Sequence, residues 1–198
     1  DAPVSAPGII AAALKLRHAR GLIPFTVMSC DNLPSNGKTA GRIVRKFAEL
    51  LGNAELENYV NTVSFPSTMI DRIVPATTDA DREIVSKIIG LDDAWPIMTE
   101  PFTQWVIEDR FPAGRPPFEL AGAQLVEDVE PFELMKLRML NGSHSTMAYL
   151  GYLAGYQYVN EAIADAGILK LIHGLMTEEA IPTLHMARET LEAYRDQL

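Results

Sequence analysis

Three polar residues in one apolar, helix-forming stretch have types and spacings that suit proton transfer. The stretch runs from Glu130 to His144 and carries Lys136, Asn141 and His144. On a regular α-helix with Lys136 at zero, His144 lies at about 80° and Asn141 at about 140° around the axis. The three side chains therefore share one broad face with apolar neighbours.

A lysine on such a face is partly desolvated, which favours its neutral form and makes it a competent general base. Asn141 and His144 are three residues apart, so they lie side by side and could hold one substrate oxygen. Lys136 and His144 are about 12 Å apart along a straight helix. All three can meet one substrate if Lys136 lies near the helix start and bends inward, or if the substrate is several carbons long. On spacing alone, a solvated lysine and a core histidine are the more common alternatives.

Composition narrows the classes of partner. The chain has 198 residues, 47% of them hydrophobic, and a net charge of -9. An acidic surface argues against nucleic acid or an anionic membrane as the main partner. No apolar run reaches the roughly 18–20 residues of a membrane span. The single cysteine, Cys30, excludes an internal disulfide and fits a reducing, cytoplasmic location.

The first part of the chain has the pattern of an α/β sheet. Pro7–Gly21 is predicted to be a helix, and the uncharged, β-rich Phe25–Cys30 a buried strand. Turn formers follow in Asp31–Gly37, and a second helix is predicted over 38–52. Ligands in such sheets bind beyond the carboxyl ends of the strands.

Further strands are predicted at Tyr59–Phe65, 103–109 and 123–129, with a capped helix beginning near Thr78. Beyond Glu130 the strand signals stop and helical periodicity continues to the last residue. The predicted fold class is therefore α/β over 1–129, followed by an all-α part over 130–198.

Several stretches together resemble the polyol-specific long-chain dehydrogenases/reductases, which include mannitol 2-dehydrogenase and fructuronate reductase (mannonate oxidoreductase). The match extends over nearly the whole chain and keeps the family's order. Its most specific element is the Lys-x4-Asn-x2-His spacing. The stretches are "FTVMSCDNLPSNG", "SFPSTMIDRIVPAT", "QWVIED", "AGRP" and "MKLRMLNGSH".

The resemblance implies the C-terminal part of a Rossmann-like dinucleotide-binding domain in 1–129 and the start of a helical substrate domain in 130–198. It implies NAD-dependent, zinc-free interconversion of a sugar alcohol or aldonate and its keto sugar. D-Mannonate and D-fructuronate are favoured over D-mannitol and D-fructose, on the stretch "MLNGSHSTMAYLGYLAGYQ". The expected partners are this small substrate and the remainder of the enzyme's own chain.

The resemblance also assigns roles to individual residues. Lys136 matches the general acid/base, and Asn141 and Asn32 match amides that stabilise an oxyanion. His144 matches a residue that orients the substrate. Without the resemblance, Asn32 would be interpreted as a turn former.

Two carboxylates complete the expected site. Glu133 matches a residue that gates proton exchange between Lys136 and water, and its alternative is a charge favoured by the helix dipole. Asp71, with Asn32, matches positions near the cofactor, and its alternative is a helix cap or a neighbour of Arg72. No metal ligand set is expected from one cysteine and four scattered histidines.

The dinucleotide fingerprint G-x-G-x-x-G does not occur in these 198 residues. In the family it lies upstream of the matched region, and a further substrate-binding arginine lies downstream. The chain is therefore expected to be the middle of an enzyme. The rival interpretation is a non-catalytic helical module that only packs against a partner, and the flanking gene sequence would separate the two.

Overall fold

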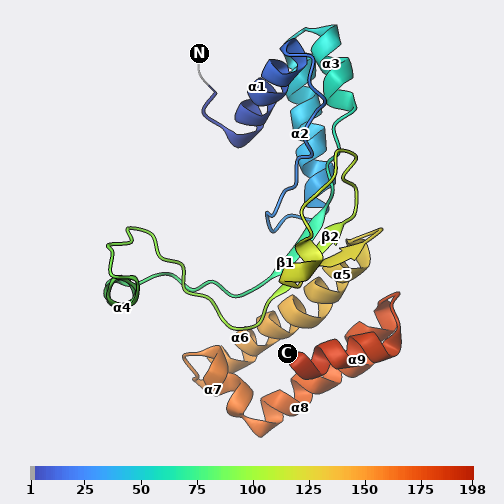
Figure 1. Ribbon diagram of the computed structural model, residues 1–198. Helices are drawn as coiled ribbons and strands as arrows, with labels where there is room; N and C mark the ends of the chain where they lie inside the picture. Colours follow the sequence, from blue (N-terminus) through green and yellow to red (C-terminus); the bar gives the residue numbers. More distant parts are fainter. Residues whose placement is uncertain (1–2) are drawn as a thin grey trace. The chain divides into compact units, whose positions relative to one another are not determined.

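The computed structural model describes residues 3–198, which form two separately packed units that divide between Glu127 and Asp128 (Figure 1). The first unit combines helices with a three-stranded sheet, and the second is helical. The predicted order, α/β followed by all-α, is confirmed. The division predicted from the sequence lies two residues later, between 129 and 130.

Three helices form the helical layer of the first unit: α1 (Ala6–Ala19), α2 (Asn36–Leu50) and α3 (Ala54–Asn61). Side chains cap two of them. The Ser5 hydroxyl accepts from the backbone N–H of Gly8 at 3.3 Å, and the Asn53 amide oxygen accepts from that of Leu56 at 3.0 Å. The helices pack around one apolar core, made of Leu14, Val27, Val44, Ala48, Leu56, Val60, Val63 and Phe65.

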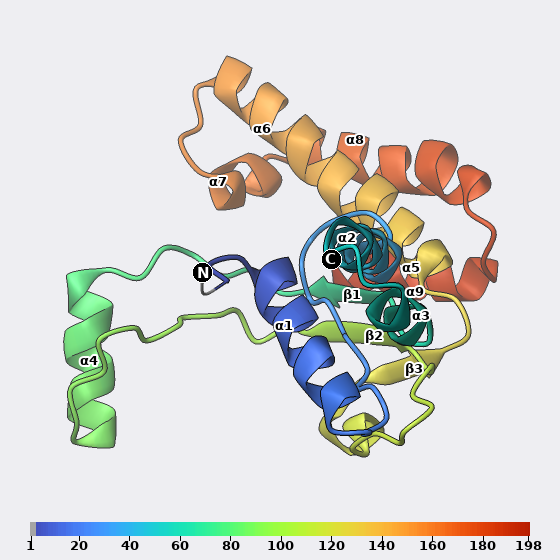
Figure 2. The same ribbon diagram turned by 90° about the horizontal axis from the view of Figure 1, so that it is seen from above.

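The sheet contains β1 (Thr68–Asp71), β2 (Gln104–Glu108) and β3 (Gln124–Val126), side by side in that order (Figure 2). β1 and β2 are antiparallel, and β2 and β3 are parallel. Val106 and Ile107 in the central strand are fully buried. The two strands predicted near 103–109 and 123–129 are therefore present, each shorter than expected. A 3-10 turn, Phe118–Ala121, interrupts the loop between them.

Two other strand predictions are wrong. Phe25–Cys30 is extended but joins no ladder, and one backbone bond, from Val27 N–H to the Ser64 carbonyl at 3.0 Å, links it to its neighbour. The strand predicted at Tyr59–Phe65 begins inside α3. The Asn53 cap starts a helix there, and Leu56 and Val60, one helical turn apart, are both buried in the core. Helical packing thus overrode the local β propensity.

Helix α4 (Asp79–Ile89) lies at the end of two extended segments (Figures 1 and 2). The predicted capping box is present: Asp81 N–H donates to the Thr78 hydroxyl at 3.2 Å, and Thr78 N–H donates to the Asp81 carboxylate at 2.8 Å. Within the described structure no residue of α4 is buried, so packing contributes little to its stability. In the stretch from Ile73 to Ile97, which includes α4, the large exposed apolar side chains are Ile73, Val74, Ile84, Ile88, Ile89, Leu91, Trp95 and Ile97.

The second unit is helical but not continuous. It consists of α5 (Glu130–Met135), α6 (Gly142–Ala154), α7 (Val159–Ala164), α8 (Ala166–Gly174) and α9 (Arg188–Gln197). Two π-helical turns, η2 (Lys136–Asn141) and η3 (Leu175–Ala180), and one 3-10 turn, η4 (Ile181–Thr183), lie between them. None of the helices in residues 3–198 combines the length and apolar character needed to cross a membrane.

Asp165 links the start of α8 to the turn between α6 and α7. Its carboxylate accepts from the N–H groups of Gly167 at 2.8 Å and Ile168 at 3.1 Å, at the start of α8. It also accepts from the Tyr156 hydroxyl at 3.0 Å. The bonds from Ile168, Tyr156 and Gly167 hold the pKa of Asp165 below its ordinary value.

We expect Asp165→Asn to lower the melting temperature at pH 7 more than at acid pH. The unfolded-state pKa is about 3.9 and the folded-state pKa is lower. The ionised carboxylate therefore stabilises the fold fully at a pH above the unfolded-state pKa. This stabilisation is lost as the pH falls through the folded-state pKa. Calorimetry between pH 7 and pH 2 measures the difference, with Glu178→Gln at an exposed position as the control. A difference from wild type that is the same at every pH would contradict this assignment.

Candidate active site

The stretch with Lys136, Asn141 and His144 does not form a regular α-helix. The chain changes from α5 to the π turn η2 at Lys136 and returns to α-helix at Gly142. The N–H of Gly142 accordingly bonds to the Leu137 carbonyl, five residues earlier. The regular α-helix assumed in the sequence analysis is therefore wrong at this stretch.

This change alters which side chains share a face. In a π turn the backbone bonds join residues five apart and each residue advances less around the axis, whereas in an α-helix residues five apart diverge by about 140°. Lys136 and Asn141 stand at the two ends of η2, so the angle between them around the axis is smaller than in an α-helix. His144 follows Asn141 by one α-helical turn. The π turn thus brings the three closer to one face than a regular α-helix would.

Burial divides the stretch into two sides. Met135 and Met139 are fully buried, whereas Asn141 and His144 are exposed. Lys136 is half-buried, as expected for a lysine beside apolar neighbours, and so is Glu133. The Lys136 N–H bonds to the Glu133 carbonyl, which places Glu133 one turn earlier. The polar groups are accessible, and the methionines anchor the helix.

A second π turn, η3, packs against η2. Arg138, between Lys136 and Asn141, fixes the contact: its guanidinium donates to the Thr183 carbonyl at 2.6 Å and to the Thr183 hydroxyl at 2.8 Å. That hydroxyl donates in turn to the carbonyl of Ala180, the last residue of η3, at 2.7 Å. One chain of hydrogen bonds therefore links the two π turns.

Asn32 and Asp71 belong to the first unit. The segment with Val27 and Ser29 runs in the same direction as the chain entering β1, because Val27 N–H bonds to the Ser64 carbonyl and the Thr68 hydroxyl donates to the Ser29 carbonyl at 2.7 Å. Asn32 follows the first of these segments and Asp71 ends the second, so both stand at the carboxyl end of parallel extended chains. Asn32 is exposed and Asp71 is buried.

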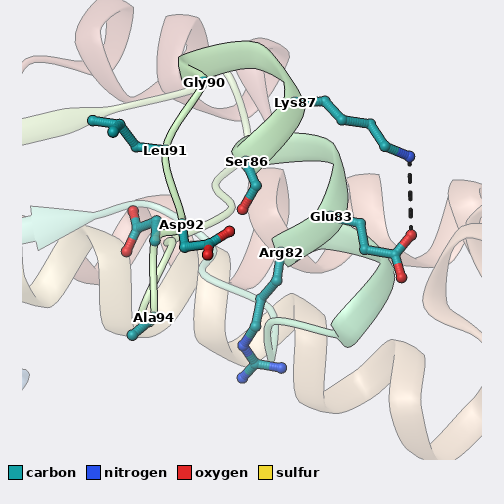
Figure 3. Close-up of a pocket in the computed structure, with 9 residues that line it drawn as sticks. Arg82, Glu83, Ser86, Lys87, Gly90, Leu91, Asp92 and Ala94 are labelled. Atoms are coloured by element: carbon teal, nitrogen blue, oxygen red, sulfur yellow. Dashed lines mark ion pairs between the residues drawn. The ribbon is translucent and has the colours of Figure 1, made fainter.

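Two surface hollows are lined by residues other than the predicted site residues. One of about 930 Å³ lies between α4 and the chain that follows it (Figure 3), and is lined by Arg82, Glu83, Ser86, Lys87, Gly90, Leu91, Asp92, Asp93 and Ala94. Lys87 and Glu83 are exposed, and their charged groups are 4.0 Å apart. A second, of about 240 Å³, is lined by Asp128, Glu130, Pro131, Leu134, Leu184 and His185.

Arg115, in the stretch "AGRP", has a local structural role. It contacts the Asp109 carboxylate through two nitrogens, at 2.8 and 3.1 Å, and the Glu119 carboxylate at 2.7 Å. The hydrogen bonds from Arg115 lower the pKa of Asp109. This motif therefore ties the end of β2 to the loop that follows it. Among residues 3–198, no group of three or more histidine, cysteine and acidic side chains is arranged to hold a metal ion.

Comparison with protein families shows to which family the chain belongs. The family described as the mannitol dehydrogenase Rossmann domain matches residues 1–120, and the mannitol dehydrogenase C-terminal domain matches residues 128–198. The chain belongs to the mannitol dehydrogenase family. The resemblance inferred from its motifs is thereby confirmed.

Family members of similar sequence include the uncharacterized oxidoreductase YeiQ of Escherichia coli, 49% identical over all of this chain and 41% of that protein. Mannitol dehydrogenase DSF1 of Saccharomyces cerevisiae is 49% identical over 93% of this chain and 37% of its own. Pseudomonas fluorescens mannitol 2-dehydrogenase, solved with NAD and D-mannitol, is 43% identical with a TM-score of 0.82, over 98% of this chain and 40% of its own. The chain thus spans about two fifths of the length of these relatives.

The link between the π turns predicts unequal effects of two arginine substitutions. Arg138→Met removes charge-assisted bonds to Thr183, at a cost of roughly 1 kcal/mol after allowance for exposure. This corresponds to a melting temperature about 2–4 °C lower for a chain of this size. The control is Arg188→Met, which removes an exposed i,i+4 pair with Glu192, and we expect a shift below about 1 °C. Equal shifts in the two variants would show that Arg138 does not hold η2.

Proposed function

We propose that the chain is the middle part of an NAD-dependent secondary-alcohol dehydrogenase that interconverts a sugar alcohol or aldonate and its keto sugar. Membership of the mannitol dehydrogenase family supports this proposal. The observation that carries it is the π turn, because that turn reduces the angle between Lys136 and Asn141 around the helix axis while Asn141 stays exposed. The match of both family domains favours this function over a non-catalytic module. The cytoplasm is its proposed location.

The proposed chemistry follows from the side chains. In the oxidation direction, neutral Lys136 takes the hydroxyl proton of the substrate, and in reduction its protonated form gives that proton back. Negative charge develops on the substrate oxygen, and the amides of Asn141 and Asn32 donate hydrogen bonds to it. His144 orients the substrate. Glu133, one turn before Lys136, exchanges the proton with water.

NAD is proposed as the cofactor, and when bound it supplies the hydride acceptor. The Pseudomonas fluorescens relative is described as a complex with NAD and D-mannitol. In this chain, Asn32 and Asp71 stand at the carboxyl ends of two parallel extended segments, where α/β folds bind ligands. These two residues would hold the cofactor at that edge. The glycine-rich turn that would hold its phosphates is not found in these 198 residues.

Two substrate pairs remain candidates. Relatives named mannitol 2-dehydrogenase or mannitol dehydrogenase, at 47% and 49% identity, favour D-mannitol and D-fructose. The stretch "MLNGSHSTMAYLGYLAGYQ" favours D-mannonate and D-fructuronate. We propose the first pair as the preferred substrates, because the relatives match over about nine tenths of the chain, whereas the stretch covers only residues 139–157.

The first test of this proposal is the pH dependence of Lys136→Ala in the full-length enzyme. For wild type, log kcat/KM for alcohol oxidation should rise with pH and level off where the free enzyme's base is neutral. Lys136→Ala should abolish this dependence and lower the rate by roughly 10²–10⁴-fold, the usual scale for a positioned acid or base. Small amines should partly restore the rate, since they replace the base without its tether.

The matched control is Lys170→Ala, which removes an exposed lysine from α8 of the same unit. It should retain the wild-type rate and pH profile. If Lys136→Ala also retains the wild-type rate and pH profile, Lys136 is a structural lysine and the proposed mechanism is wrong.

A substrate panel tests the choice between the two pairs. With NADH and the full-length enzyme, we expect a higher kcat/KM for D-fructose than for D-fructuronate. Initial rates over a range of concentrations of each compound measure it. The opposite ranking would assign the enzyme to the aldonate pair and leave the general reaction unchanged.

A further inference from the structure

A buried amide holds the loop that carries Asn32. Asn36, the first residue of α2, is 2% exposed. Its side-chain nitrogen donates to the carbonyls of Asp31 and Thr68, each at 2.9 Å, and to the Thr68 hydroxyl at 3.2 Å. Its side-chain oxygen accepts from the N–H of Thr68 at 2.9 Å. One side chain therefore joins the loop to the sheet.

These bonds take the place of a strand that would otherwise pair with the outer edge of β1. In an antiparallel pair, the N–H and C=O of one residue point to the same side, and those of its neighbours point to the other. The Ser67 carbonyl accepts from Glu108 N–H at 3.0 Å on the β2 side, so the groups of Thr68 face the open edge of β1. The Asn36 amide satisfies both groups there, as a neighbouring peptide unit would.

The surrounding backbone leaves this loop little freedom. Among residues 3–198, Ser35 is the one non-glycine residue with a positive φ, 46°, a conformation that persists only where the surroundings impose it. At Gly37, an added Cβ would lie 2.5 Å from the Pro66 backbone, so the start of α2 lies directly against the chain entering β1. The Thr68 hydroxyl holds the other end of the loop through the Ser29 carbonyl.

Asn32 thus lies between two fixed points. Asp31 before it is held by Asn36 through its carbonyl, and Ser35 after it is fixed in the left-handed conformation. We propose that Asn36 is a positioning residue, which sets the backbone of 31–35 and thereby aims the Asn32 amide at the substrate oxygen. This inference rests on the role proposed for Asn32 above. Asn36 itself is buried and needs no contact with the substrate.

The test is a double-mutant cycle in the full-length enzyme. Misplacement of a reacting or stabilising group by about 1 Å can cost on the order of 10²-fold. We expect Asn36→Ala to lower kcat for alcohol oxidation by about 10-fold to 10²-fold, with little change in KM for NAD. Asn32→Ala should cost about 10²–10³-fold, as for one oxyanion donor. The double variant should be no slower than Asn32→Ala, because Asn36 acts only through Asn32.

The matched control is Asn53→Ala in the same unit. Asn53 also holds a backbone N–H with its side chain, at the start of α3, but has no bond to the loop. This variant should lower the melting temperature and leave kcat unchanged. If the effects of Asn36→Ala and Asn32→Ala multiply in the double variant, Asn36 acts on overall stability and the inference is overturned.

If Asn36→Ala does not fold, substitutions at Thr68 test the positioning role instead. Thr68→Val removes the hydroxyl that accepts from Asn36 and donates to Ser29, whereas Thr68→Ser retains it. We expect a lower kcat for Thr68→Val and a restored kcat for Thr68→Ser. If Asn32→Ala is slow but Thr68→Val, or a folded Asn36→Ala, has a wild-type kcat, the positioning role of Asn36 is refuted. The role proposed for Asn32 is then retained. A wild-type kcat for Asn32→Ala refutes the role of Asn32 in the proposed function, and the inference with it.

Discussion

The arrangement of the first unit depends on the pairing of Asn36 with Thr68. A strand at the edge of a sheet presents N–H and C=O groups, and burial without partners makes them strongly destabilising. Thr68 is 2% exposed, so water cannot satisfy these groups. The Asn36 amide does so and, in the same geometry, fixes the start of α2 and the loop 31–35. The same hydrogen bonds therefore satisfy the buried backbone groups of Thr68 and fix the backbone of the loop that carries Asn32.

The second unit reaches a similar result by a different route. An α-helix from Glu130 to Ala154 would turn Asn141 away from Lys136, whereas the π turn narrows the angle between them while Met135 and Met139 stay buried. A π turn is rare in proteins, so its presence here needs support from the surroundings. The contact with η3 and the bonds from Arg138 to Thr183 provide that support.

Local signals in the sequence predicted part of this structure. The Thr78 capping box and the strand around Val106 were predictable, because a cap and an apolar run each depend on neighbouring residues. The π turn was not, since helical periodicity presumes 3.6 residues per turn. Nor was the role of Asn36, which the sequence presents only as one more turn former. Its partner Thr68 is 32 residues away, and only the folded chain brings them together.

Both units combine accessible polar side chains with buried anchors. Asn32 is exposed and Asn36 beside it is buried, and in the second unit Asn141 is exposed while Met139 is buried. A group that stabilises developing charge must reach the substrate, yet it must not reorient during the reaction. An exposed side chain meets the first requirement, and only a rigid backbone beneath it can meet the second. For the role proposed for these amides, the left-handed Ser35 and the π turn are local costs of holding them, offset by the burial of their neighbours.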